Sequence, residues 1–264
     1  MADKLSEKDI ENISIEGTEE HAIMPLRNTV LFPQQVIPIY IGREKSLKLI
    51  SDLESEKRKY IIVVAQEDGS IEDPKPEDLY AYGTLATVLK VFAMPDNSKS
   101  AIVQGISRVK ILDYIEKEPY FKAAVSTISD DPVGDELELI GISDKLRNSF
   151  SDLIKVAPNL TEEHTGMLSN IQKPNRLVDR AISLMTLSNQ EKQDILEETN
   201  VKKRIEKAIS IINREIQRIK LGDEIQTEVH DEIAKTQREY YLRCLLYTSP
   251  SPRDLSTSRM PSSA

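Results

Sequence analysis

Short apolar runs separated by turn residues fill the chain from about residue 22 to residue 128. Runs of this kind, rich in Val, Ile, Tyr and Phe, are typical of β-strands. One helix interrupts them at 42–56, where leucines and an isoleucine recur on a single side. The pattern predicts strands at 30–32, 36–41, 60–65, 83–92, 101–106, 109–115 and 121–125.

Prolines and turn residues constrain how these strands can pair. Pro33 and Pro38 flank or interrupt the run at 36–41. A missing backbone N–H is tolerated mainly at a sheet edge or a bulge, so we place this run there. The segment MPDNSKS at 94–100 lies between two strand-like runs and supplies Pro, Asp, Asn and Ser, which predicts a hairpin.

Helical spacing of apolar residues replaces the strand pattern from about Asp135 onward. The first helix is expected to stop before Pro158, and a second to start at Thr161. A third is predicted at 175–187, and Ser188 with Glu191 has the form of a capping box before a fourth. Helices this short should pack together as a bundle.

A long charged helix is predicted to follow the bundle. Its isoleucines repeat at spacings of 4-3-4-3, which is the pattern of a coiled-coil seam, before the phase slips at Gly222 and resumes at Ile225. About 40 residues would make a helix roughly 60 Å long. We expect the seam to pack on the bundle or on another chain and to give weak self-association. The seam residues are Ile205, Ile209, Ile212, Ile216 and Ile219.

These patterns predict an α+β fold with a polar segment at each end. Residues 1–20, with seven acidic and two basic side chains, are expected to be a disordered leader. Residues 244–264, which contain six Ser and three Pro, are expected to be a disordered tail foreign to the native protein, so that the chain is a fragment. Between them we predict a β-rich domain at 21–128, a helical bundle at 129–200 and a coiled-coil-like helix at 201–243.

Composition excludes several classes of function. A formal charge of −9 disfavours nonspecific binding to nucleic acid or anionic membranes. No apolar run approaches the roughly 20 residues of a membrane span and no signal peptide is recognisable, so we expect a cytoplasmic protein. The single cysteine, Cys244, lies in the tail, and His21, His164 and His230 lack metal-ligand spacing. Neither a metal nor a cofactor is therefore expected in this chain.

Catalytic motifs are poorly supported. The segment GREKS at 42–46 superficially resembles a phosphate loop, but Glu44 stands where that motif needs Gly. Ser107 and Lys110 match the S-x-x-K pattern, which works on a helix, yet they sit between two strand-like runs. Neighbouring acidic residues lie beside prolines in polar segments, where nothing would raise a carboxyl pKa for acid catalysis.

Binding has better candidates in two groups of residues. One group consists of apolar side chains near prolines and turns, which either close the β core or form an exposed patch for partners. Its members are Phe32, Val36, Ile37, Phe92 and Met94. The other group is the charged start of the helix at 42–56, which we expect to set orientation or to hold neighbouring parts together. It comprises Arg43, Glu44 and Lys45.

Four ordered blocks carry a resemblance to a known family. They are MPLRNTVLFPQQVIPIYIGREKSLKLI at 24–50, IIVVAQEDGSIEDPKPEDLYAYGTLATVLKV at 61–91, IVQGISRVKI at 102–111 and TQREYYLR at 236–243. Together they resemble the N-terminal region of the bacterial-type Lon ATP-dependent proteases. The resemblance implies a β-rich, pseudo-barrel-like substrate-recognition domain, a helical bundle and a long helix that leads toward an AAA+ ATPase module and a Ser-Lys protease module.

The resemblance also implies a division of labour. The Walker motifs and the protease serine motif are absent from this sequence, so ATP and Mg would belong to the missing part of the parent. The chain itself would be non-catalytic and would bind unfolded or misfolded proteins while helping to assemble a parent that is homohexameric. Two alternatives stay open: a stand-alone Lon-type domain acting as an adaptor or small-molecule sensor, and a coiled-coil scaffold.

Overall fold

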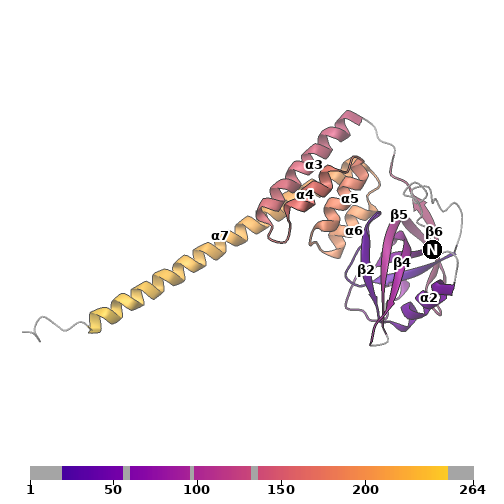
Figure 1. The fold of residues 1–264 in the computed structure, drawn as a ribbon, viewed down its shortest axis with the longest axis horizontal. Helices are drawn as coiled ribbons and strands as arrows, with labels where there is room; N and C mark the ends of the chain where they lie inside the picture. Colours follow the sequence, from indigo (N-terminus) through magenta and orange to yellow (C-terminus); the bar gives the residue numbers. More distant parts are fainter. Residues whose placement is uncertain (1–19, 56–59, 96–97, 132–135, 249–264) are drawn as a thin grey trace, which may run out of the picture. The chain divides into compact units, whose positions relative to one another are not determined.

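The computed structural model describes residues 20–55, 60–95, 98–131 and 136–248, and it is drawn in Figure 1. It divides into two compact units, Met1–Asn213 and Arg214–Ala264. The first unit holds the strands and most of the helices. The second holds the distal part of the last helix.

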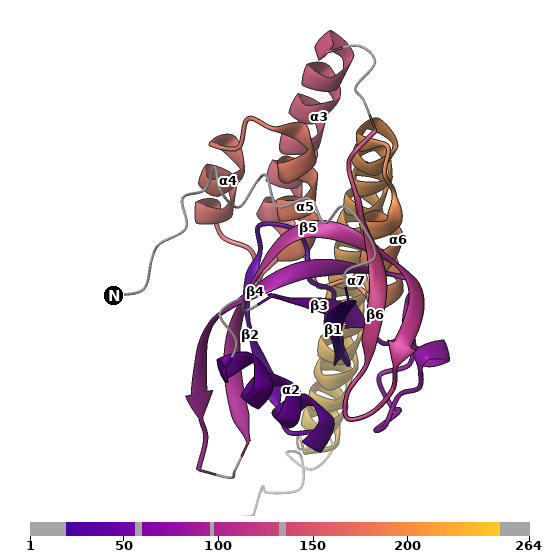
Figure 2. The ribbon, with the colours of Figure 1, turned by 90° about the vertical axis from the view of Figure 1, so that its right-hand side faces the viewer.

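Six strands form one sheet in the order β2-β5-β4-β3-β1-β6. An additional pairing between β5 and β6 closes the sheet into a barrel that contains every strand except β2. The barrel is visible in Figure 2. The pairing of β1 with β3 is parallel, and the other pairings are antiparallel. The strands are β1 (Glu20–Leu26), β2 (Val36–Ile41), β3 (Tyr60–Ala65), β4 (Tyr82–Ala93), β5 (Lys99–Glu116) and β6 (Lys122–Ile128).

The long strand β5 explains how one sheet can form a closed barrel and still have an edge strand. Its first part, Lys99 to Gln104, pairs with β2, and its later part, Arg108 to Glu116, pairs with β6. The strand β2 has no other partner among the described strands, so it lies at an edge, as its proline indicated. The predicted hairpin is confirmed, because Ala93 on β4 pairs with Lys99 on β5.

Two strand predictions were wrong. Residues 30–32 form no strand, because the chain turns back directly after them, where Gln34 adopts a positive φ of 63° and its N–H bonds to Gly105 O at 3.0 Å. The runs at 101–106 and 109–115 are a single strand, since pairing with β4 continues past the register shift between Gly105 and Ser107. The strand β1 was missed because its sequence, EHAIMPL, mixes polar residues and a proline with few β-branched ones.

Helix α2 (Glu44–Ser55) supplies much of the core of the β-rich part. Its apolar stripe of Leu49, Ile50 and Leu53 is buried against side chains of β1, β2 and β3, as predicted from the spacing. Each such side chain stabilises the fold by roughly 1.5–3 kcal/mol when it is removed from water. The short 3-10 helix η1 (Pro76–Asp78) lies in the connection between β3 and β4.

Four shorter helices confirm the predicted bundle. They are α3 (Glu136–Val156), α4 (Glu162–Ser169), α5 (Pro174–Leu184) and α6 (Asn189–Glu197). The capping box before α6 is present: the Glu191 N–H donates to Ser188 Oγ at 3.3 Å, and the Ser188 N–H donates to Glu191 Oε2 at 3.1 Å. The end of α5 at Leu184 falls short of the predicted residue 187.

Partly buried polar contacts join this bundle to the barrel. Gln193 of α6 donates to the Tyr82 carbonyl at 3.0 Å, and the Tyr80 hydroxyl donates to Gln190 at 2.8 Å. A cluster of charged groups adds to these bonds. In it Arg204 Nη2 lies 2.5 Å from Asp130 Oδ1. The β-rich part and the bundle therefore belong to one compact unit, and the boundary between units falls later, after Asn213.

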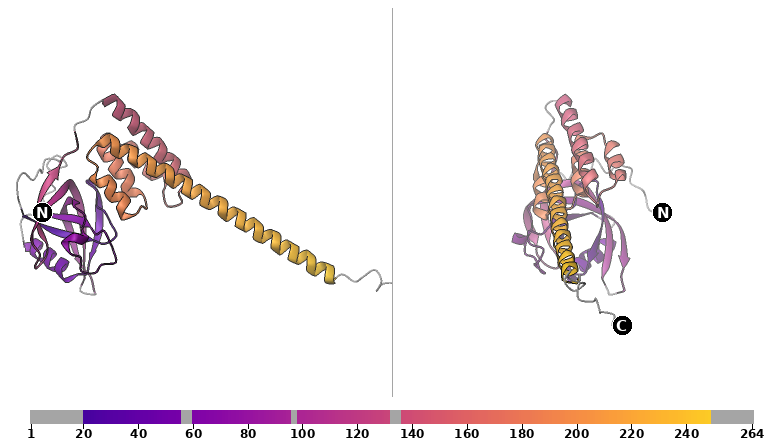
Figure 3. Two further views of the ribbon diagram at one scale, coloured as in Figure 1. Left: turned by 180° about the vertical axis from the view of Figure 1, so that it is seen from behind. Right: turned by 90° about the vertical axis from the view of Figure 1, so that its left-hand side faces the viewer.

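The last helix, α7 (Val201–Thr248), contains the predicted seam and is continuous in Figure 3. Within the first unit Ile205, Ile209 and Ile212 are buried, so they belong to the core and not to a surface for another chain. In the second unit Ile216 and Ile219 are half-buried. No helix in the described part of the chain is long and apolar enough to cross a membrane.

The predicted end of the long helix at Arg243 was wrong by five residues. The segment from Cys244 to Thr248 is helical because it contains neither Gly nor Pro. The leader up to residue 19 and the tail from residue 249 lie outside the described residues, and Glu20 begins β1.

Candidate functional site

A strip of exposed apolar side chains crosses the outer face of β2, β5 and β4. Tyr40 of β2 and Phe92 of β4 both pair with Ser100 of β5, one from each side, so the three residues stand in one row across the sheet. Alternation along β2 adds Val36 to the same face. Met94 directly follows the last residue of β4 and is also exposed. We call Val36, Tyr40, Phe92 and Met94 the outer strip. Their exposed fractions are 49%, 65%, 39% and 43%.

The five apolar residues that the sequence analysis named as candidates differ in their exposure. Val36, Phe92 and Met94 are exposed, and Ile37 is partly buried against the core. Phe32 is 1% exposed, so it is a core residue and the expectation that it contacts a substrate was wrong. In the turn after it, the Phe32 N–H donates to Gln35 Oε1 at 3.1 Å.

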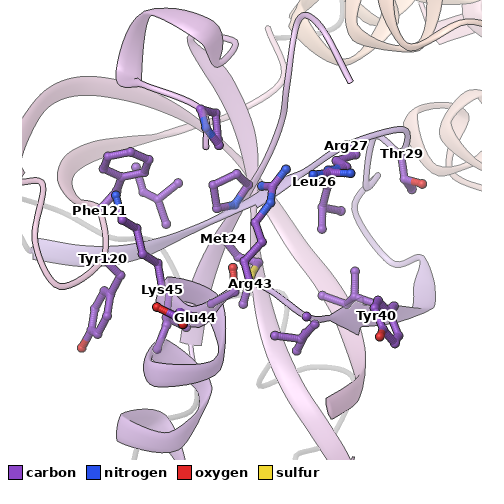
Figure 4. A pocket seen from close by; sticks show the side chains of 18 of the residues that line it. Met24, Leu26, Arg27, Thr29, Tyr40, Arg43, Glu44, Lys45, Tyr120 and Phe121 are labelled. Carbon is purple, nitrogen blue, oxygen red and sulfur yellow. The ribbon is translucent and has the colours of Figure 1, made fainter. Parts of the chain in front are cut away.

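A pocket of about 840 Å³ lies beside the outer strip, and we call it the edge pocket (Figure 4). Residues of β1, β2 and the start of α2 line it, with Tyr120 and Phe121 at one end. Tyr40 borders the edge pocket and also belongs to the outer strip. The two features therefore form one continuous surface around β2.

Charged residues at the start of α2 brace the walls of the edge pocket. Arg43 Nη2 donates to Gln66 Oε1 at 2.7 Å and to the Ile71 carbonyl at 3.3 Å. Burial and then the nearby Arg27 guanidinium lower the pKa of Arg43 from its ordinary value. These bonds fix the loop after β3 against the start of α2.

Lys45 links three other segments at the same place. Its Nζ lies 3.2 Å from Glu118 and 3.3 Å from Asp73, and 5.9 Å from the centroid of the Phe121 ring. The hydrogen bond to Glu118 is the main reason that the pKa of Lys45 is raised. Glu44 occupies the first turn of α2, where an acidic side chain is favourable to the helix dipole. A role for these residues in orientation or assembly stays a prediction.

The S-x-x-K match that the sequence analysis considered and set aside does not form a catalytic pair in the described structure. Ser107 and Lys110 lie in the single strand β5, so the helical spacing that an S-x-x-K pair needs is absent there. Among the described residues no group of three or more His, Cys, Asp or Glu side chains could hold a metal ion.

Sequence reasoning missed Tyr40 and the edge pocket. A signal for Tyr40 existed, because alternation in VIPIYI places it on the same face as Val36. The pocket gave no such signal, since its walls come from segments that are far apart in the chain, such as Arg27 and Tyr120.

Comparisons with known proteins agree on one family. The profile of the ATP-dependent protease La (LON) substrate-binding domain matches residues 20–214. Lon protease from Dictyoglomus thermophilum is 38% identical over 221 residues, which is 84% of this chain and 28% of that protein. Lon protease from Koribacter versatilis is 38% identical over 222 residues, covering 84% of this chain and 27% of that protein. The chain thus spans about a quarter of the length of these relatives.

A solved structure shares the fold. The N-terminal domain of Lon protease from the Mycobacterium avium complex has a TM-score of 0.61 at 17% sequence identity, with 74% of this chain and 98% of that domain covered.

Proposed function

The chain belongs to the family of Lon substrate-binding domains, and from that premise we propose that it captures polypeptide segments with exposed apolar side chains for an ATP-dependent Ser-Lys protease. The observation that carries the proposal is the outer strip, which continues into the edge pocket at Tyr40. In this role the chain is non-catalytic, and the parent degrades misfolded and regulatory proteins.

Unfolded clients suit this surface for a physical reason. A folded protein buries most of its large apolar side chains, whereas an unfolded one presents them to any apolar surface. Burying a side chain such as Phe or Met contributes roughly 1.5–3 kcal/mol before ordering costs are subtracted. Four residues of the outer strip could thus support a micromolar dissociation constant, which corresponds to about −8 kcal/mol.

Two findings support this reading over a stand-alone adaptor. The relatives are named Lon protease. The charged residues of the edge pocket are bonded to each other and to neighbouring loops, as the contacts of Arg43 and Lys45 illustrate. Such groups shape the pocket wall, which favours a surface for a chain over a specific site for a small molecule.

Assembly of the parent is a second part of the proposal. In the second unit the apolar residues Ile225, Val229 and Ile233 of α7 follow one another at helical spacing and are each about half exposed, at 53%, 50% and 54%. A stripe of this kind is removed from water by packing against another helix. We propose that it contacts a second copy of the chain.

The proposal can be tested with one client in two states. A reduced and alkylated protein that cannot fold should bind the chain with micromolar affinity in fluorescence anisotropy, and the native form of the same protein should not. Equal affinity for both states, or no binding of the unfolded state up to high micromolar concentration, would remove the chain from substrate recognition and leave it a structural role.

A further inference from the structure

A second pocket, of about 680 Å³, lies where the turn before β2 faces helix α5. We call it the basic pocket, because Lys173, Arg176 and Arg180 line it. Among the described residues, the acidic side chain in its lining is Asp179, which is buried and bonded to Arg108 at 2.5 Å. Asp179 is therefore already paired with Arg108, and the described lining is mainly basic in a chain whose net charge is −9.

Helix α5 holds two of these cations in a fixed arrangement. Arg176 and Arg180 are four residues apart, so they lie on the same side of the helix. Leu177, Val178 and Ile182 are buried and anchor α5 in the unit. The first turn of α5 contains no acidic residue of its own, and Asn175 Nδ2 in that turn donates to Asp130 Oδ2 at 2.9 Å.

Arg180 gives the clearest sign that the pocket is made for an anion. Its side chain is half-buried, and its Nη2 contacts Met167 Sδ at 3.8 Å. A thioether is only a weak acceptor. Among the residues that the structure describes, no carboxylate bonds to Arg180, although Arg carries five N–H donors in a fork that matches a carboxylate.

The basic pocket adjoins the outer strip. Val36 belongs to the outer strip and also lines the basic pocket. At the rise of a strand, Tyr40 lies only about 13 Å from Val36. An extended polypeptide whose apolar side chains cover the outer strip would therefore place its next residues beside Arg176 and Arg180.

We propose that the basic pocket is a subsite for carboxylates and that it selects clients in which an apolar stretch is flanked by Asp and Glu residues. This inference rests on the proposed function, because the apolar stretch is what the outer strip binds. Charge complementarity and contact with an apolar surface together identify the occupant as an acidic polypeptide segment.

Three labelled peptides with one apolar core test the subsite. Their flanks carry four Glu, four Gln or four Lys residues, and anisotropy gives their dissociation constants for the full chain at low salt. The Glu peptide should bind about tenfold more tightly than the Gln peptide, and the Lys peptide more weakly than either. The preference for Glu should shrink as salt is raised toward 1 M, because charges are then screened within about 3 Å.

Two double variants locate the effect. The double variant with Arg176→Gln and Arg180→Gln should bind the Glu peptide only as tightly as the Gln peptide. Its affinity for the Gln peptide should equal that of the wild type. Removing two cations elsewhere, Lys155→Gln with Lys207→Gln, should preserve the preference. If the arginine variant unfolds, Lys173→Gln, at an exposed position before α5, should still reduce the preference.

The outcomes separate this inference from the function on which it rests. Equal binding of the Glu and Gln peptides by the wild type, or a preference that survives in the arginine variant, would overturn the subsite alone. Failure of all three peptides to bind would instead overturn the proposed function. If the Glu peptide binds only after residues 2–19 are deleted, the pocket serves the chain's own acidic segment, and a client subsite is overturned.

Discussion

Arg108 Nη2 lies 2.5 Å from Asp179 Oδ1, and both side chains are buried between strand β5 and helix α5. Arg108 Nε also donates to the Leu196 carbonyl at 3.0 Å, and Arg204 Nη1 lies 3.7 Å from the same Asp179 oxygen. One carboxylate thus holds together a barrel strand, a bundle helix and the start of α7. These contacts make the strands and helices of the first unit one folded body.

Removing the Asp179 carboxylate should strongly destabilise the folded chain. In Asp179→Ala two buried guanidinium groups lose their shared partner, so we expect the free energy of unfolding to fall by about 3–5 kcal/mol. Urea denaturation of the chain measures the change. The control is Asp152→Ala, which breaks an exposed pair with Lys155 and should cost at most about 1 kcal/mol. Similar losses in the two variants would show that the buried cluster does not hold the unit together.

Asp130 should make stability depend on acid pH. Burial alone would raise its pKa, but Arg204 and then Arg108 bring the pKa below its ordinary value of 3.8. Because the folded pKa is the lower one, this contribution is complete above the ordinary value and is lost as the pH falls through the lowered value. Wild-type chain should therefore lose stability below about pH 4 more steeply than Asp130→Asn. Asp179 is present in both proteins, so its raised pKa affects both in the same sense. Parallel stability curves for the two proteins would contradict the assignment.

Gly105 should tolerate no side chain. A Cβ atom there would lie 2.3 Å from the Phe32 carbonyl oxygen, which is backbone and cannot step aside. Gly105→Ala should lower the free energy of unfolding by more than about 2 kcal/mol or displace the turn that carries Gln34. Gly141→Ala is the matched control, since nothing lies within 4 Å of its Cβ position in α3. That change should be neutral or stabilise by up to about 1 kcal/mol. Thermal melts of both variants test the prediction. A Gly105→Ala variant that melts at the wild-type temperature would contradict the close packing of this turn.

Self-association should depend on the distal part of α7. Ile225→Asp with Ile233→Asp places charges on the exposed stripe and should abolish concentration-dependent association without a change in melting temperature. Ile212→Asp should act differently, because Ile212 is buried in the first unit and its substitution should unfold that unit. Light scattering across a dilution series follows both effects. A wild-type chain that stays monomeric at high concentration would contradict the proposed contact.

Local patterns predicted those parts of the fold whose causes are local. Apolar spacing identified α2 and α7, the Ser188 box placed α6, and the proline in 36–41 marked an edge strand. The same local reasoning named Val36, Phe92 and Met94 as candidates for an exposed patch; all three are exposed, and their role in binding stays a prediction. It failed at β1, whose strand conformation is imposed by pairing with β3 and β6.

Long-range polar contacts could not be predicted from the sequence. Arg108 and Asp179 are separated by 71 positions and look like ordinary surface charges in their local surroundings. Only the packing of α5 onto β5 brings them together and excludes water from both. The same holds for the basic pocket, whose walls belong to a turn near Gln34 and to α5.

The central claim is that exposed apolar side chains of the outer strip bind unfolded polypeptide. The most direct measurement is the affinity of Tyr40→Ser with Phe92→Ser for the reduced and alkylated client, compared with wild type and with Leu112→Ser, an apolar residue that is 57% exposed elsewhere on β5. The account predicts at least about tenfold weaker binding for the double variant, with an unchanged melting temperature, and wild-type affinity for Leu112→Ser. Wild-type affinity in the double variant, or an equal loss in Leu112→Ser, would contradict it.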